Sequence, residues 1–429
     1  MNRGVYSLAL RALSPLVWLW MGHRARRAGG QWEIFSPERF GRVAGAHAAS
    51  WTAPVWVHAV SLGETRAAQP LLQALLDRGL PVLLTHMTAT GRAEGARLFA
   101  EAIARGQLRQ AWLPYDFPGA ARRFMAAYRP RCGLLIEREI WPNLLAAARG
   151  AKVPMALVSA RFSASSLRQA CRMGGVMREA LGGLDAVLAQ TSEDAARLVQ
   201  AGAPQPVVTG NLKFDLVLPA AQVGAGQAWH ERLGRRVVAV ASTREGEDGG
   251  FIQAIKGQSA LRGAPLFLLI PRHPQRFDEA ARLLSEAGLP YVRRSQGAEP
   301  GPDTAVMLGD TLGEMAFYYA AADVAIVAGS FAPLGGQNLI EACAAGVPVI
   351  VGPHTFNFKQ AAEDAIAAGA ALRAPDTGQA VEAAMALLGD EARRRRAAQA
   401  ALAWFRMHSG ATGRTLEALA PWLETQTPG

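Results

Sequence analysis

Short apolar runs alternate with amphipathic stretches along most of this 429-residue chain. In the first half the strand candidates are Val55–Val60, Pro81–Thr85, Ala111–Leu113, Cys132–Ile136, Val153–Val158, Ala186–Ala189 and Val207–Thr209. Nearly continuous apolar runs of this kind are typical of parallel strands that are covered on both faces by helices. The pattern therefore predicts a parallel, doubly wound α/β sheet.

A second alternating series follows an irregular stretch at 211–236, which contains Pro219 and Gly-Ala-Gly at 224–226 and indicates a linker. The later strand candidates are Val237–Ala241, Leu266–Ile270, Tyr291–Arg293, Ala305–Leu308, Ala325–Ala328 and Val347–Val351. A chain of this length fits two domains. We expect a GT-B architecture, that is, two Rossmann-like domains with a cleft between them. The expected divisions are an N-terminal membrane-associated segment at 1–30, one domain at 31–215, and a second domain with C-terminal helices at 216–429.

The N-terminal segment is apolar from Val5 to Met21, but Arg11 and Pro15 interrupt it. A membrane-spanning helix needs about 20 apolar residues, so this run is short for a span. Basic residues follow it at Arg24, Arg26 and Arg27, and they would keep the rest of the chain on the cytoplasmic side. We expect a helix that lies in the membrane interface, with a single spanning anchor as the alternative.

Charge is unevenly distributed between the two halves. Residues 1–215 carry 26 Lys and Arg against 14 Asp and Glu, whereas residues 216–429 carry 19 against 21. A basic first half indicates an anionic partner, and a membrane with anionic lipids fits that charge. Nucleic acid is the other class of anionic partner, but no nucleic-acid-binding motif accompanies the charge, so we expect none.

Three cysteines, Cys132, Cys171 and Cys343, lie far apart in the sequence and show no metal-binding spacing. Their odd number and wide separation are typical of a reducing, cytoplasmic compartment. The sequence also lacks an Asp-x-Asp pair or a His/Cys cluster. We therefore expect neither a metal nor a cofactor.

The stretch 323–358, DVAIVAGSFAPLGGQNLIEACAAGVPVIVGPHTFNF, has the strongest ligand-binding pattern. It predicts a strand, a loop with Gly335 and Gly336, a helix that begins at Asn338 and ends at Gly346, and a second strand. Glycine lets a backbone approach a ligand closely, and a helix start presents free N–H groups to an anion. Glu341 would lie on the same helical face as Asn338, where the pair could hold ribose hydroxyls. An ordinary βαβ turn is the alternative.

Carboxylates follow two of the predicted strands, at the sheet edge where α/β folds bind ligands. Glu64 lies in WVHAVSLGETRAAQPLL, and Glu137 lies in IEREIWPNLL. The alternative for Glu64 is helix capping, and the alternative for Glu137 is an ion pair with Arg138. Side chains alternate along an extended chain, so we expect Arg138 to face away from Glu137 and Glu139. His58 is expected to be a core residue or a residue behind the site.

Three further loops carry candidate binding residues. Arg272 follows a predicted strand in LLIPRHPQRF, and its guanidinium fork suits a phosphate, with a structural salt bridge as the alternative. Lys213 lies in VTGNLKFD, and a point cation suits a substrate carboxylate. The stretch GDTLGEM, 309–315, leads into a predicted helix.

Taken together, these stretches resemble the bacterial 3-deoxy-D-manno-octulosonic acid (Kdo) transferases of lipid A inner-core synthesis. The resemblance rests on GGQNLIEA, GPHTFNF, VSLGE, IEREIWPN, VTGNLKFD, PRHP, GDTLGEM, ASTREGED and SARFSASS, which occur from Glu64 to Phe358 and cover most of the chain. Gln337, Arg138 and Arg244 stand where the family usually has His, Thr and His. Because the Gln337 side chain differs from the family's His, a role for the Gln337 backbone is better supported than a role for its side chain.

The resemblance implies an inverting glycosyltransferase that moves Kdo from CMP-Kdo to a lipid A precursor, lipid IVA, at the cytoplasmic face of the inner membrane. It implies Glu64 as catalytic base, Glu137 as transition-state support and Lys213 near the reaction centre. The implied CMP contacts are Pro271, Arg272, Leu312, Gly313, Glu314, Asn338, Leu339, Ile340 and Glu341. Two alternatives stay open: another GT-B enzyme, such as a UDP-sugar transferase or epimerase, and a non-catalytic protein that binds lipid or nucleotide.

Overall fold

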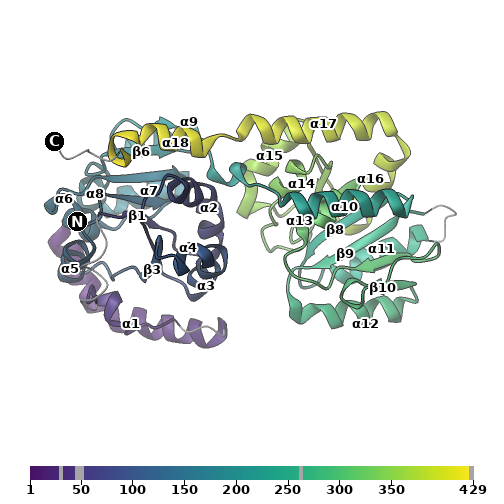
Figure 1. The fold of residues 1–429 in the computed structure, drawn as a ribbon, viewed down its shortest axis with the longest axis horizontal. Coiled ribbons are helices and arrows are strands. Elements are labelled where there is room, and N and C mark those ends of the chain that lie inside the picture. The colour runs from purple at the N-terminus through teal and green to yellow at the C-terminus, as the bar shows by residue number, and fades with distance from the viewer. Residues whose placement is uncertain (29–31, 44–52, 260–263, 425–429) are drawn as a thin grey trace. The chain divides into compact units, whose positions relative to one another are not determined.

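The computed structural model describes residues 1–28, 32–43, 53–259 and 264–424. The chain forms two compact units (Figure 1). The first unit comprises Met1–Leu216 together with the C-terminal residues from Ser409, and the second unit comprises Val217–His408. Each unit contains one seven-stranded sheet, and every strand pair in both sheets is parallel.

The first sheet has the strand order β3-β2-β1-β4-β5-β6-β7. Its strands are β1 (Val55–His58), β2 (Val82–His86), β3 (Leu108–Trp112), β4 (Cys132–Ile136), β5 (Met155–Ala160), β6 (Ala186–Ala189) and β7 (Val207–Val208). All seven candidates are confirmed as strands, two with their expected bounds. The others differ at one or both ends because the apolar run that marks a strand is longer or shorter than its hydrogen-bonded ladder.

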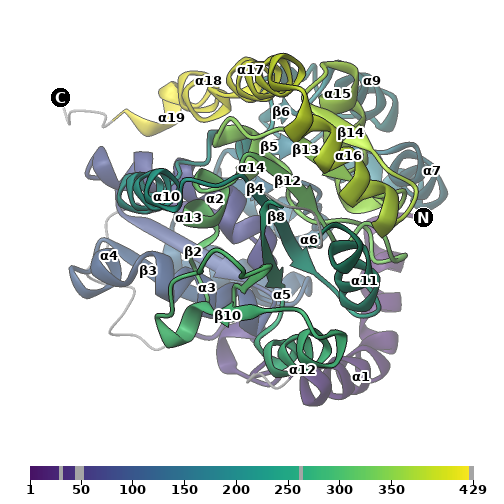
Figure 2. The same cartoon turned by 90° about the vertical axis from the view of Figure 1, so that its right-hand side faces the viewer.

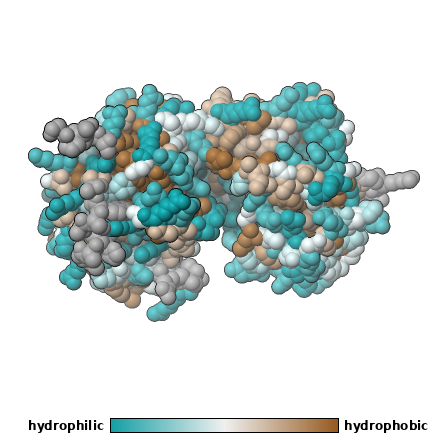
Figure 3. Space-filling view, in the orientation of Figure 1, coloured by the Kyte–Doolittle hydropathy of each residue, from teal (hydrophilic) through white to brown (hydrophobic). Residues whose placement is uncertain are grey.

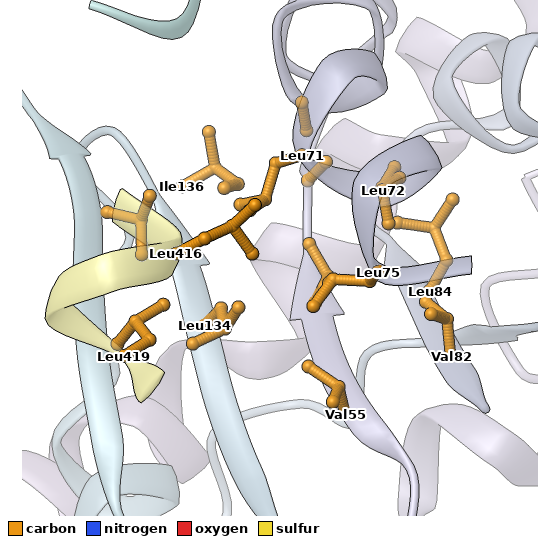
Figure 4. Close-up of a cluster of buried hydrophobic side chains, with 14 of the residues drawn as sticks. Val55, Leu71, Leu72, Leu75, Val82, Leu84, Leu134, Ile136, Leu416 and Leu419 are labelled. Carbon is orange, nitrogen blue, oxygen red and sulfur yellow. The ribbon is translucent and has the colours of Figure 1, made fainter. Parts of the chain in front are cut away.

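Helices cover both faces of the first sheet. They are α1 (Arg3–Ala28), α2 (Leu62–Asp77), α3 (Ala89–Leu98), α4 (Ala100–Ala104), α5 (Pro118–Tyr128), α6 (Pro142–Gly150), α7 (Ala164–Met173), α8 (Gly175–Leu181), α9 (Ser192–Ala201), α18 (Ala411–Ala418) and α19 (Ala420–Leu423). One buried cluster lies on the side of α2 and α18, and another on the side of α5 and α6. Figure 4 shows Leu416 of α18, and Leu419 just after this helix, beside Leu134 and Ile136 of β4.

The second sheet has the order β10-β11-β9-β8-β12-β13-β14. Its strands are β8 (Val237–Thr243), β9 (Leu266–Pro271), β10 (Tyr291–Arg293), β11 (Val306–Leu308), β12 (Val324–Val327), β13 (Val349–Val351) and β14 (Ala371–Arg373). The pattern analysis missed β14, because its three residues form an edge strand that is too short to give a periodic signal.

Helices also cover both faces of the second sheet (Figure 2). They are α10 (Ala220–Leu233), α11 (Asp248–Ser259), α12 (Phe277–Ala287), α13 (Met315–Ala320), α14 (Ile340–Ala344), α15 (Lys359–Ala367), α16 (Thr377–Gly389) and α17 (Glu391–His408). Residues of α11, α12 and α16 belong to one buried cluster, and residues of α10 and α13 belong to the other.

The C-terminal residues differ from the expected division of the chain. We expected 216–429 to form one domain, but the chain from Ser409 belongs to the first unit. The Asp215 carboxylate accepts hydrogen bonds from the backbone N–H groups of Gly410, Ala411 and Thr412. Leucines of α18 and α19 then fill the first core. Burial of these apolar side chains, which lie far from their partners in sequence, holds the terminus on the first unit.

The stretch 211–236 was also interpreted incorrectly as a linker. Residues Ala220–Leu233 form α10, although Gly224 and Gly226 disfavour a helix. The Trp229 ring is buried against Phe317 of α13. Gly226 lies so close to α13 that a Cβ atom would sit 2.4 Å from the Phe317 carbonyl oxygen. Tertiary packing therefore requires glycine at a position where local helix propensity disfavours it.

Each sheet reverses its strand order next to its first strand. In the first unit β1 lies between β2 and β4, and in the second unit β8 lies between β9 and β12. Loops that follow the two central strands leave in opposite directions at such a reversal and open a crevice at the carboxyl ends of the strands. The candidate ligand-binding crevice of each unit is therefore formed by the segments that follow these strands. They are the segments after β1 and β4 in the first unit, and those after β8 and β12 in the second.

Candidate active site

Glu64 lies in the first turn of α2, directly beyond the end of β1. Its Oε2 accepts a hydrogen bond of 2.7 Å from the Val60 backbone N–H, and its Oε1 lies 3.4 Å from the Ser61 hydroxyl. The capping contact that we weighed as an alternative is thus present, but it engages mainly one oxygen. Burial raises the pKa of Glu64 to about 8, and the negative charges of Glu139 and Glu137 add to the increase.

Glu137 and Lys213, which are far apart in sequence, form an ion pair in the first unit. The Lys213 Nζ donates a hydrogen bond of 2.6 Å to Glu137 Oε1. Glu137 has φ +62° in a turn after β4, so the chain is not extended there. The argument that Arg138 faces away by strand alternation was therefore wrong. The partner of Glu137 is Lys213, and Arg138 instead acts electrostatically on Glu139.

Glu139 and His58 complete this cluster, although no role was predicted for Glu139 and His58 was expected in the core or behind the site. Burial raises the pKa of Glu139 to about 7 and lowers the pKa of His58 to about 3. The His58 Nε2 has no hydrogen-bond partner among the described residues and lies 3.9 Å from Glu139 Oε2. His58 is therefore a neutral residue behind Glu139, as expected for a residue behind the site. The signal for Glu139 was available, since it is a second carboxylate two positions after Glu137.

This cluster can accept a proton near neutral pH. Three carboxylates lie close enough to influence one another, but only Glu137 has a direct cationic partner, Lys213. Like charges in a partly buried site make it costly to ionise every member, so one member keeps a high proton affinity. A carboxylate whose pKa lies near the working pH is well suited to general-base catalysis. The pKa of Glu64, about 8, is higher than that of Glu139, about 7.

In the second unit, the loop after β12 is held by the buried side chain of Glu247. This carboxylate is 1% exposed and accepts hydrogen bonds from backbone N–H groups of the loop. Its donors are Gly329 at 2.7 Å, Phe331 at 2.9 Å and Ala332 at 3.2 Å, together with Arg244 at 2.8 Å. The sequence analysis quoted Glu247 only as part of ASTREGED. Its four backbone contacts identify it as the residue that fixes the loop at this crevice.

Gly335 and Gly336 both adopt positive φ, at +95° and +81°. The Gly336 N–H donates to the Gly329 carbonyl at 2.7 Å, which closes the loop on itself. A Cβ atom at Gly335 would sit 2.2 Å from the side-chain nitrogen of Asn357. These left-handed glycine conformations bring the backbone of GGQN close to the segment GPHTFNF.

Asn338 and Glu341 are joined, as their spacing predicted. The Asn338 Nδ2 donates to Glu341 Oε1 at 3.0 Å, and the Asn338 Oδ1 accepts from the Ile340 N–H at 3.1 Å. The helix α14 begins at Ile340 rather than at Asn338, so Asn338 lies two residues before the helix and its side chain accepts the N–H of the first helical residue. Leu339 and Ile340 have buried side chains, so they can offer a ligand mainly their backbone groups.

Arg272 lies near this segment at the end of β9, where its N–H donates to the Thr243 carbonyl at 3.0 Å. The charges of Arg272 and Glu341 both influence the pKa of the buried Tyr319 phenol. Burial raises the pKa of Tyr319, the Glu341 carboxylate raises it further, and the Arg272 guanidinium opposes the increase. The structure therefore brings Arg272 and Glu341, which are 69 positions apart in the chain, to the same place.

The three residues of the segment Leu312–Glu314 differ in their contacts and in their exposure. The Glu314 carboxylate is bound by Arg294 at 2.9 Å and by the Thr311 hydroxyl, and neither partner is a predicted site residue. Gly313 has φ +83°, and its carbonyl accepts from Gln222 of α10 at 2.9 Å. The Leu312 side chain is 70% exposed. Leu312 is therefore available to a ligand, whereas the Glu314 carboxylate is already engaged by Arg294 and Thr311.

Comparison with known proteins yields two family models and several close relatives. Residues 36–216 match the 3-deoxy-D-manno-octulosonic-acid transferase model, and residues 291–404 match the model of glycosyl transferases group 1. The chain is 71% identical to a 3-deoxy-D-manno-octulosonic acid transferase of Bordetella pertussis over 99% of this chain and 100% of the relative. It is 31% identical to one from Haemophilus influenzae over 86% of this chain and 87% of the relative.

Two solved structures are similar in fold. A putative UDP-N-acetylglucosamine 2-epimerase from Listeria monocytogenes superposes with a TM-score of 0.58 at 15% identity, over 88% of this chain and 99% of that one. A glycosyltransferase from Rickettsia africae superposes with a TM-score of 0.57 at 11% identity, over 88% of this chain and 100% of that one. At these identities the likeness concerns the fold alone. It agrees with the two parallel α/β units described above, and the expected GT-B fold class is confirmed.

The raised pKa of Glu64 predicts how stability depends on pH. The folded protein holds this proton up to about pH 8, whereas an unfolded glutamate releases it near 4.5. Between these values the folded state binds more protons, so stability falls as pH rises and the loss is complete above about pH 8. Glu64→Gln removes the ionisable group. The variant should melt at a higher temperature than the wild type above pH 8, and the difference should shrink towards pH 4.5.

Thermal melts across this pH range check the prediction. Glu417→Gln is the matched control, because Glu417 is an exposed glutamate on α18 of the same unit. Its melting temperature should follow that of the wild type at every pH. Equal melting profiles for Glu64→Gln and the wild type would show that Glu64 ionises normally.

Proposed function

The chain belongs to the 3-deoxy-D-manno-octulosonic acid (Kdo) transferase family, and from this premise we propose how its residues carry out the transfer. The protein is a glycosyltransferase. The donor that fits is CMP-Kdo, and the acceptor is the lipid A precursor lipid IVA in lipopolysaccharide core synthesis. The observation that carries the proposal is the partly buried cluster of Glu64, Glu137 and Glu139 at the reversal point of the first sheet.

Glu64 is the general base of the proposed reaction. Its carboxylate takes the proton of an acceptor hydroxyl while that oxygen attacks the anomeric carbon of Kdo. The bond from the anomeric carbon to the phosphate oxygen breaks, and CMP leaves with the electron pair, so the configuration inverts. Because Val60 engages mainly one carboxylate oxygen, the other oxygen is available to the proton.

The ion pair of Lys213 with Glu137 supports the transition state. The Lys213 ammonium balances the Glu137 carboxylate, and together they offer a positive and a negative group to an oxocarbenium-like centre that also carries a substrate carboxylate. Glu139, with neutral His58 behind it, keeps the proton affinity of Glu64 high.

The second unit binds CMP in this proposal. The phosphate lies at the glycine loop and Arg272, where backbone N–H groups and a guanidinium fork are available to an anion. Asn338 and Glu341 hold the ribose hydroxyls. Pro271, Leu312, Gly313, Glu314, Leu339 and Ile340 complete the CMP contacts. Glu247 acts indirectly, by fixing the loop from Gly329 to Ala332.

We propose that the enzyme lies on the cytoplasmic face of the inner membrane. Residues Arg3–His23 form the one helix in the described parts of the chain that is long and apolar enough to cross a membrane. One face of α1 packs on the first unit: Met21 joins Trp32 and Tyr115, and the Tyr6 hydroxyl donates to Asp116 at 2.9 Å. The exposed large apolar side chains of α1 are Val5, Leu8, Leu13, Leu16, Val17, Leu19 and Trp20.

A helix that is apolar on both faces requires two apolar surroundings. The first unit covers one face of α1, and a lipid bilayer would cover the other. Figure 3 shows apolar residues along the lower part of the first unit, where Figure 1 places α1. Because α1 is attached to the unit near Tyr6 and again at Met21, it is better suited to lie in the interface than to leave the unit and span the membrane.

Glu64→Gln should abolish transfer and preserve donor binding. The amide keeps the shape of the side chain but cannot accept the proton, and loss of a general base lowers a rate about 10²–10⁴-fold. In the wild type the rate should rise with pH up to about 8, because only the ionised carboxylate is a base. Mass spectrometry of the lipid acceptor after incubation with CMP-Kdo measures transfer, and calorimetry measures CMP affinity. Activity within a few-fold of wild type would refute the role of base.

Gly336→Val should weaken CMP binding more than Gln337→Ala. A β-branched side chain is strongly disfavoured at the φ of +81° that Gly336 adopts. Its Cβ would lie in van der Waals contact with the His354 carbonyl oxygen, at 3.4 Å, so the strain would come from the backbone conformation. The loop would have to rearrange, whereas loss of the Gln337 side chain leaves the backbone intact. Calorimetric titration with CMP compares the two variants, and an equal or larger loss for Gln337→Ala would indicate recognition by the side chain.

Leu19→Asp should release the protein from membranes. Leu19 is 71% exposed on α1, and burying a leucine side chain is worth about 1.5–3 kcal/mol. Membrane partitioning should therefore fall at least about tenfold. Val199→Asp on α9 is the control, since it introduces the same charge at another exposed apolar position of the first unit. Fractionation at high salt measures the effect. A Leu19→Asp protein that stays in the pellet after alkaline extraction would favour a spanning helix.

A further inference from the structure

We propose that a groove formed by α1, α5 and α6 is a binding site for an anionic phospholipid of the bilayer. Its phosphate would lie among arginines, and its glycerol and upper acyl chains would lie on an apolar floor. The lipid would be a bound membrane component and not the acceptor of the transfer reaction. This inference goes beyond the proposed reaction, and it rests on the proposed contact of α1 with the membrane.

The groove has a volume of about 1240 Å³. It runs along α5 and α6 from the starts of both helices, at Pro118 and Asn143, to their ends, at Arg129 and Gly150. The first three turns of α1 line it between Arg3 and Arg11. Its volume exceeds that of a typical small-molecule pocket, so it can hold a phosphate head group with part of its lipid tail.

The charge of the groove has a single sign. Its cationic lining residues are Arg3, Arg11, Arg122, Arg129, Arg131 and Lys152. Among the described residues that line the groove, none is Asp or Glu. Such a concentration of one charge selects a ligand with a strong negative charge, and a phosphate can accept several hydrogen bonds from guanidinium groups.

Three of these cations have no protein partner. Arg11, Arg122 and Lys152 form no ion pair or side-chain hydrogen bond with the residues that the structure describes. Arginines elsewhere on this unit are often paired, as Arg66 and Arg97 are with Glu94. Unpaired like charges that line one cavity repel one another, and an anion bound among them would relieve that repulsion.

Two of the cations also occupy backbone positions that favour glycine. Arg129 ends α5 with φ +42°, and Lys152 follows the end of α6 with φ +57°. Glycine is the usual residue where a helix ends in the left-handed conformation. A basic side chain there complements the helix dipole, but that effect does not explain Arg122 in the middle of α5 or Arg11 on α1. A common phosphate ligand explains the whole set.

The apolar part of the lining indicates that the ligand is a lipid and not a free anion. Leu8, Met125, Pro130 and Val153 contribute apolar surface to the groove. Leu8 also belongs to the exposed apolar face of α1, for which we propose contact with the bilayer. A phospholipid that stays anchored in that bilayer would satisfy both kinds of surface. The lining residues include none of Glu64, Glu137, Glu139 and Lys213, so the groove is distinct from the carboxylate cluster.

The test uses a soluble short-chain lipid, so that binding does not report the general field of a membrane. Dihexanoyl phosphatidylglycerol is titrated into the full-length protein in a non-ionic detergent, and binding is followed by calorimetry. We expect saturation with one lipid per chain. Dihexanoyl phosphatidylcholine, which has no net charge, and inorganic phosphate, which has no tail, should each bind more weakly.

The variant Arg11→Gln with Arg122→Gln removes two unpaired cations of the groove. Each cation near an anionic lipid is worth about a fivefold change in affinity, so the pair should weaken phosphatidylglycerol binding about 25-fold. Arg78→Gln with Arg172→Gln is the matched control, because it removes the same charge from exposed positions just after α2 and on α7 of the same unit. The control should bind phosphatidylglycerol like the wild type. Melting temperature and CMP affinity should be unchanged in both double variants.

Three results would overturn the proposal. The first is phosphatidylglycerol binding that does not saturate, and the second is an equal loss of affinity in the groove variant and in the control. The third is displacement of the lipid by the lipid A precursor at equal or lower concentration, which would make the groove an acceptor subsite. Loss of transfer with intact phosphatidylglycerol binding, or the reverse, separates this proposal from the proposed reaction.

Discussion

The reversal of strand order in each parallel sheet is the constraint on which the chemistry of this protein depends. At a reversal the loops diverge, and side chains that follow two neighbouring strands meet where the sheet ends. Both units place a carboxylate in the segment that follows the central strand, fully buried at Glu247 and partly buried at Glu64, but they use it differently. Glu247 accepts four backbone N–H groups and is fully occupied in holding a loop. Glu64 accepts one strong hydrogen bond and keeps its proton affinity.

The difference between these carboxylates follows from how burial is compensated. A buried negative charge is stable when several donors surround it, and it becomes a stronger base when neighbouring charges are also negative. Glu137 and Glu139 supply those charges to Glu64, and Lys213 offsets only part of them. The first unit is basic in net charge, yet it concentrates acidic groups at the crevice and keeps arginines in the groove between α5 and α6.

The sequence predicted the strands well, because buried parallel strands are short apolar runs between turn residues. It also predicted that Asn338 and Glu341 would meet, since they are three positions apart on one local element. It failed for α10, where glycines suggested a linker, and for the terminus, which was expected to stay with the second unit. Both errors concern segments that are held by partners far away in sequence, and local periodicity contains no information about such partners.

By itself, the sequence determined the α/β class, the two-unit plan and the family. Apolar periodicity and the order of the motifs are local properties, so they can be observed in the sequence alone. Only the tertiary structure decided which charged groups meet. The pairing of Lys213 with Glu137 depends on β7 and β4 belonging to one sheet, and the turn at Glu137 overrides the alternation expected of a strand. The proton affinity of Glu64 likewise depends on burial and on Glu139, because the energy of a charge is set by its surroundings in space and not by its neighbours in sequence.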